Sequence, residues 1–240
     1  MVQIVGFALS VLVPLLALFF IHQGPHCPMP RRRWRWTGYL AGTSAFVAAL
    51  VSAVAVYVIS AGAVDLVDRA ATTWRILPVL ALIEELSRFV VLVFYSLRGP
   101  VRPGVRDGIM YGLAAGIVFA LLENVMTFGG PGAGSAASGW LRIGLATPLH
   151  ALLGGLMGCL LVRLRDRGAV GLAAALLVPT IVHIVYDAPV IYAVSRAGEE
   201  MSLGTAVTAI SLSAAIVLGL AVLLIRLFHR AAPAAPAARS

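Results

Sequence analysis

The chain has 240 residues, of which 60% are hydrophobic and only 12% are charged, and its mean hydropathy is +0.97. These values lie far outside the range of soluble globular domains and predict an integral membrane protein. The net charge of +8 does not indicate a nucleic-acid partner, because every basic residue is an arginine and most lie beside the ends of apolar segments.

Seven apolar runs follow one another along the sequence. Each is about 20 residues long, as a helix rising ~1.5 Å per residue needs to cross a hydrocarbon core of ~30 Å. We therefore predict an all-α, polytopic bundle of about seven transmembrane helices, in which the first run stays in the protein because nothing around it resembles a cleavage site. The expected spans are residues 2–21, 37–59, 74–97, 108–128, 140–162, 170–194 and 204–228.

The arginines predict how the bundle is oriented. Thirteen of the 18 fall on one side of the predicted spans, whereas Arg69, Arg75, Arg142 and Arg196 fall on the other. The positive-inside rule then places the N-terminus outside and the C-terminus in the cytoplasm of a multi-pass protein of the cell membrane. Residues 1–230 are expected to form one transmembrane domain, and the Ala/Pro-rich residues 231–240 a disordered cytoplasmic tail.

Polar side chains at membrane depth are concentrated in four of the predicted helices. Such residues are costly in hydrocarbon and usually have a partner or a function, so together they form the candidate catalytic site. The candidates are Glu84, Glu85, Arg88, Glu123, Asn124, His150, His183 and Asp187.

Helical spacing suggests how these side chains are grouped. At about 100° per residue, Arg88 lies between the directions of Glu84 and Glu85, so we expect its guanidinium to reach both carboxylates. His183 and Asp187 are four residues apart and share one helical face. Counted from the outer end of each run at ~1.5 Å per residue, the acids and histidines lie about 8 to 16 Å deep, which predicts one layer open to the extracytoplasmic side.

Prolines lie near these positions, at Pro78, Pro148, Pro179 and Pro189. We expect them to break the helices and to free backbone carbonyls that line a polar cavity.

Four glycines, Gly112, Gly116, Gly154 and Gly158, have the small-xxx-small spacing that permits close helix packing. Because glycine is common in membrane helices, we interpret them as composition rather than as a packing motif.

The two cysteines do not predict a disulfide framework, since Cys27 falls in a cytoplasmic loop and Cys159 in the middle of a helix. His22, His26 and Cys27 are loosely spaced donors in that short loop, and we interpret them as incidental rather than as a metal site.

Three motifs resemble those of one protein family. Residues 84–88 read EExxR, residues 119–124 read FxxxEN and residues 183–187 read HxxxD, with His150 between the last two. Their order over residues 74–190 resembles the PrsW family of intramembrane proteases, related to the CAAX prenyl proteases. The CAAX enzymes have a histidine where this chain has Glu123, which disfavours a prenylated substrate, and the PrsW pattern usually has lysine where this chain has Arg88.

The resemblance implies a protease whose glutamate activates water and whose substrates are membrane-anchored anti-sigma factors, cut on the extracytoplasmic side. In this hypothesis Glu84 or Glu85 is the base, His150 or His183 donates a proton, and Asn124 adds an oxyanion donor. A rival mechanism uses Glu123, His150 and His183 as ligands of one Zn²⁺.

Two other classes of function fit the same polar residues. A proton- or ion-coupled transporter would use them to relay charge, and a non-catalytic scaffold would use them to hold helices together.

Overall fold

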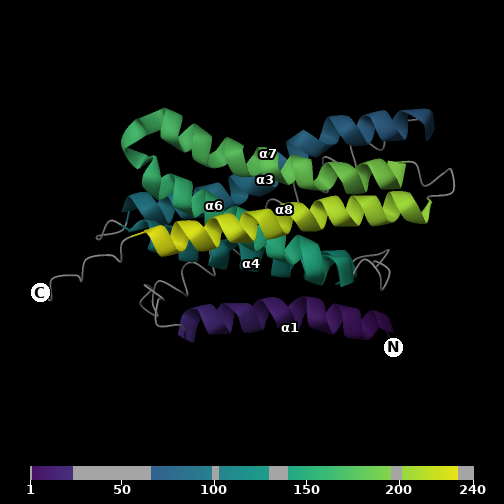
Figure 1. Ribbon diagram of the computed structural model, residues 1–240, viewed down its shortest axis with the longest axis horizontal. Helices are drawn as coiled ribbons and strands as arrows, with labels where there is room; N and C mark the ends of the chain where they lie inside the picture. The colour runs from purple at the N-terminus through teal and green to yellow at the C-terminus, as the bar shows by residue number, and fades with distance from the viewer. Residues whose placement is uncertain (1, 24–65, 99–102, 130–139, 196–201, 232–240) are drawn as a thin grey trace, which may run out of the picture.

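The computed structural model describes residues 2–23, 66–98, 103–129, 140–195 and 202–231. All regular elements within these ranges are helices, and the long ones run roughly along a common direction as a bundle (Figure 1). In chain order they are α1 (Val2–Gln23), α3 (Leu66–Arg98), α4 (Val105–Gly129), the π-helical turn η1 (Arg142–Ala146), α6 (Thr147–Arg163), the short 3₁₀ turn η2 (Arg165–Arg167), α7 (Gly168–Ser195) and α8 (Leu203–Arg230). The all-helical prediction is confirmed for the described residues.

Six of the predicted spans coincide with long helices, and the remaining one, residues 37–59, lies outside the described residues. Within the described part, four segments are long and apolar enough to cross a membrane, namely Val105–Met126, Arg142–Arg163, Arg165–Pro189 and Leu203–Arg230. Helix α3 is continuous, but charged residues near its middle interrupt its apolar sequence, and α1 has a shorter apolar stretch, Ala8–Ile21. A multi-pass membrane protein is supported, whereas the total of seven helices and the orientation remain predictions.

Helix α6 lies at the centre of the bundle and packs against α3, α4, α7 and α8. Thirteen of its 17 residues are buried, as expected for a helix that is apolar on all sides. One apolar cluster, which includes Met157, joins it to α3, α4 and α7, and another, which includes Leu153, joins it to α4, α7 and α8. A polar residue on α6 is therefore held between several helices at once.

The outward faces of the bundle are apolar. On α1, α7 and α8, large aliphatic and aromatic side chains are more than half exposed, for example Phe20 at 67%, Ile181 at 57% and Leu218 at 66%. Contiguous apolar surface of this kind is unfavourable in water and favourable against lipid. The exposed surface of the fold, like the composition of the chain, is therefore typical of a membrane protein.

Helices α4 and α6 make the closest contact in the bundle, and glycines create it. A Cβ atom on Gly116 would overlap the carbonyl oxygen of His150, so only glycine lets the two backbones approach so closely. Our interpretation of the glycines as mere composition is thus wrong. The facing pairs are Gly108 with Gly158, Gly112 with Gly154, and Gly116 with His150.

The predicted helix breaks are mostly wrong. Pro78 lies inside α3, and Pro179 and Pro189 lie inside α7, without ending either helix. A transmembrane helix tolerates proline when its neighbours accommodate the lost hydrogen bond. Of the four, only Pro148 coincides with a change of geometry, since it is the second residue of α6, which follows the π-helical turn η1 directly.

Candidate active site

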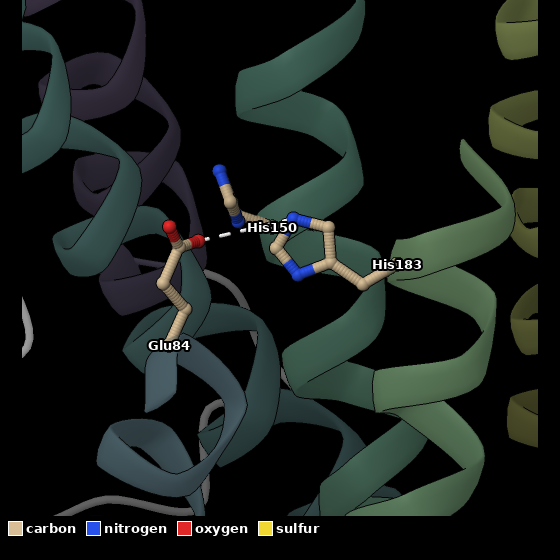
Figure 2. A group of neighbouring side chains, drawn as sticks. All are labelled: Glu84, His150 and His183. Carbon is tan, nitrogen blue, oxygen red and sulfur yellow. Dashed lines mark ion pairs between the residues drawn. The ribbon is translucent and has the colours of Figure 1, made fainter. Parts of the chain in front are cut away.

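Helices α3, α6 and α7 each direct one ionisable side chain toward a common point. Glu84, His150 and His183 face one another there (Figure 2), and one potential ligand atom from each lies within 4.8 Å of the others. Because α3 and α7 both pack against α6, residues 33 to 99 positions apart in the sequence are neighbours in space. The structure thus brings three of the predicted site residues together.

Arg88 and Glu85 form an ion pair inside the bundle. Nη2 of Arg88 pairs with Oε1 of Glu85, and the two side chains are 1% and 0% exposed. The guanidinium also lies over the ring of Phe119 on α4, 4.5 Å from its centroid. Among the described contacts Arg88 does not bond to Glu84, so the prediction that it holds both carboxylates is wrong, because its second nitrogen is turned toward α6.

The contact with Nη1 of Arg88 determines which nitrogen of His150 carries the ring proton. Nη1 of Arg88 lies 2.8 Å from Nδ1 of His150, and Nε2 of the same ring lies 2.8 Å from Oε2 of Glu123. A guanidinium can only donate, so Nδ1 must supply a lone pair and the ring proton belongs on Nε2, beside Glu123. Both nitrogens of His150 are therefore engaged.

His183 is held at one nitrogen and open at the other. Its Nδ1 lies 2.9 Å from Oε1 of Glu85, which already accepts from Arg88, so Nδ1 donates its proton to that carboxylate. Its Nε2 faces two further carboxylates, Oδ2 of Asp187 at 3.4 Å and Oε2 of Glu84 at 3.8 Å. Nε2 is thus the histidine nitrogen directed at the reachable part of the site.

Exposure separates the two adjacent glutamates. The side chain of Glu85 is 0% exposed and its Oε1 accepts from both Arg88 and His183, whereas the side chain of Glu84 is 20% exposed and faces Nε2 of His183. A group that removes a proton from water must be within reach of water. Of the pair, only Glu84 meets that condition.

Glu123 forms an ion pair with Arg142, an arginine that the sequence analysis used only to predict the orientation of the bundle. Nη2 of Arg142, from η1, lies 2.8 Å from Oε1 of Glu123, while Oε2 of the same carboxylate contacts His150. Arg142 had been counted among the arginines outside the membrane because it follows a loop. Its spacing after the FxxxEN motif carries no signal that would have revealed the pairing.

Asn124 uses its side-chain amide for contacts between helices, and its Oδ1 accepts from Nη1 of Arg142 at 3.4 Å. Its Nδ2 donates to the main-chain oxygen of Ser10 at 3.0 Å and to Oγ1 of Thr147 at 3.1 Å. The carbonyl of Ser10 needs this donor because Pro14, four residues on, has no N–H. Both amide hydrogens are thus used to tie α1, α4 and α6 together, which contradicts the expected role of Asn124 as an oxyanion donor.

A catalytic zinc needs about three protein ligands, each with a free lone pair. Glu84 and Nε2 of His183 have one, but Nδ1 of His150 accepts from Arg88, and Nε2 of that ring carries the proton and lies 2.8 Å from Oε2 of Glu123. The oxygens of Glu123 are directed at Arg142 and His150. The arrangement therefore does not fit a site made of Glu123, His150 and His183, and the cluster of Glu84, His150 and His183 fits only if His150 first loses one of its bonds.

Cys159 is a free, buried cysteine of α6. His22 is in α1, and His26 and Cys27 lie outside the described residues.

A protein-family model described as the PrsW family intramembrane metalloprotease matches residues 32–227 of the chain. The match confirms the resemblance inferred from the three motifs and favours a protease over a transporter or a scaffold. No match was found among curated proteins or among solved structures.

Proposed function

The chain belongs to the PrsW family of intramembrane proteases, and from this we propose that Glu84 is the general base that activates water for peptide-bond hydrolysis. The supporting observation is the contrast between the two glutamates: Glu85 is enclosed by Arg88 and His183, whereas Glu84 is reachable and faces Nε2 of His183 (Figure 2). A carboxylate beside an imidazole is a suitable pair for moving a proton from water to a leaving amine.

In the proposed reaction, Glu84 takes a proton from water and the resulting hydroxide attacks the peptide carbonyl. Glu84 passes this proton to Nε2 of His183, which faces it, and His183 delivers the proton from Nε2 to the departing amine. Glu85 keeps the ring of His183 oriented by accepting from Nδ1, and Arg88 keeps Glu85 in place. We assign the donor role to His183 rather than to His150, because Nδ1 of His150 accepts from Arg88 and its Nε2 lies against the carboxylate of Glu123.

The substrates of an intramembrane protease are membrane proteins, and it meets them within the bilayer. We propose that this enzyme cuts single-pass proteins of the anti-sigma-factor kind near the extracytoplasmic side of the cell membrane. The arginine distribution and the depth of the site below the predicted outer ends of the helices support that side.

The test uses the purified full chain in vesicles together with a single-pass anti-sigma factor. Glu84→Gln, which keeps the shape of the side chain but removes its basicity, is expected to abolish cleavage while leaving the melting temperature close to that of the wild type. Asp166→Asn is the matched control, because Asp166 is 87% exposed and lies outside the site in η2. Cleavage at the wild-type rate by Glu84→Gln would refute the assignment of the base.

A further inference from the structure

A continuous series of polar contacts leads from the reachable side of the site to its buried centre. Its outer members, Arg142 and Glu123, are 21% and 26% exposed, whereas its inner members are at most 5% exposed. In order, the series runs from Arg142 to Glu123, His150, Arg88, Glu85 and His183.

Each contact in the series depends on how the preceding side chain is oriented. Oε2 of Glu123 faces Nε2 of His150 while Oε1 is bonded to Arg142, so the guanidinium fixes the rotation of the carboxylate. Nδ1 of His150 presents a lone pair to Arg88 only when the ring proton is on Nε2, and the carboxylate of Glu123 at 2.8 Å favours that tautomer. Arg88 in turn holds Glu85, which orients His183.

The backbone at Arg142 has an unusual geometry that affects its direction. Arg142 is the first residue of the π-helical turn η1, in which the N–H of Thr147 bonds to the carbonyl of Arg142. Relative to an α-helix, one extra residue in a turn rotates the preceding residues by about 100° around the axis. Such turns are frequent at functional sites, and here the turn accompanies an arginine that faces α4 and Glu123.

We propose that Arg142 is a positioning residue of the protease. By holding Glu123, it keeps His150 and Arg88 in the orientation that reserves Glu85 for His183 and leaves Glu84 free to act on water. This inference rests on the proposed function of Glu84, and it assigns a role to an arginine outside all three sequence motifs.

Four variants test the proposal in the vesicle assay: Arg142→Gln, Arg142→Lys, Glu123→Gln and the double variant Arg142→Gln/Glu123→Gln. Loss of an orienting partner typically lowers activity about 10- to 100-fold, so we expect Arg142→Gln to lower kcat by that factor with KM little changed. Arg142→Lys is expected to recover most of the activity, because Glu123 is contacted through a single nitrogen at 2.8 Å. Arg226→Gln, on an exposed face of α8, is the control and is expected to match the wild type.

The double variant separates positioning through Glu123 from any other role. If Arg142 acts through Glu123, removing it from a Glu123→Gln background changes kcat no further. An unchanged kcat in Arg142→Gln would overturn the proposal, as would a double variant whose losses multiply. If Glu84→Gln cleaves normally in the same assay, the proposed base is wrong, whereas an inactive Glu84→Gln beside a fully active Arg142→Gln refutes only the positioning role.

Discussion

The side-chain amide of Asn124 on α4 donates to the main-chain carbonyl of Ser10 on α1 at 3.0 Å, and that carbonyl is the one that Pro14 deprives of its helical partner. Asn124, the residue after Glu123, thus attaches α1 to α4. The family model begins at residue 32 and does not cover α1. Helix α1 is therefore bound to the same part of α4 that carries the site.

We expect Asn124→Ala to lower the free energy of unfolding by about 0.6 to 1.7 kcal/mol, the usual range for a hydrogen bond between membrane helices. Pro14→Ala in the Asn124→Ala background should restore part of this loss, because an N–H at position 14 can bond to the carbonyl of Ser10. Thermal unfolding in detergent measures both effects. A double variant no more stable than Asn124→Ala alone would contradict this account of the bond.

The close contact of α4 with α6 makes a prediction about glycine. Gly116→Ala should destabilise the protein by about 1 to 3 kcal/mol or more, because the new methyl group would collide with the backbone oxygen of His150. It should also lower the cleavage rate, since His150 lies in the site. Gly219→Ala is the matched control on α8, where an added Cβ has no neighbour within 4 Å. Equal melting temperatures for the two variants would be inconsistent with close packing at Gly116.

The buried ion pair predicts an asymmetry between removing one partner and removing both. Glu85→Gln leaves Arg88 without its carboxylate in a place where both side chains are at most 1% exposed, and such a loss typically costs about 3 to 5 kcal/mol. The double variant Glu85→Gln/Arg88→Met removes the stranded charge and is expected to unfold at a higher temperature than Glu85→Gln. Both should cleave slowly, because His183 loses its orientation. Additive losses of stability would argue against a strongly coupled pair.

The bonding of His150 predicts the response to metal removal. With both ring nitrogens engaged, the residues do not present three free ligands, so we expect cleavage to persist after exhaustive chelation of the purified protein. Elemental analysis before and after treatment establishes whether a metal was present and removed. Activity that disappears on chelation and returns with Zn²⁺ would show that His150 leaves Arg88 or Glu123 to bind the ion, and would require a different mechanism.

Composition and periodicity were sufficient to predict the class of fold, because a membrane demands long apolar helices whatever their packing. The motifs on residues 84–88, 119–124 and 183–187 were likewise sufficient to identify the family. Both properties are carried by local segments of the chain, so they can be seen without knowing which helices touch.

The different roles of the polar residues within the site could not be predicted from the sequence, because they depend on contacts between helices. Glu84 and Glu85 are adjacent and chemically identical, and only the positions of Arg88 and His183 make one buried and the other reachable. In the sequence, Arg142 resembles the other arginines at the ends of the predicted helices. Its ion pair with Glu123 is seen only in the structure, where Arg142 begins the π-helical turn before α6. Charge and hydropathy depend on the residue alone, whereas burial and hydrogen bonding depend on neighbours that are distant in sequence, and for that reason only the tertiary structure decided which polar residues act together.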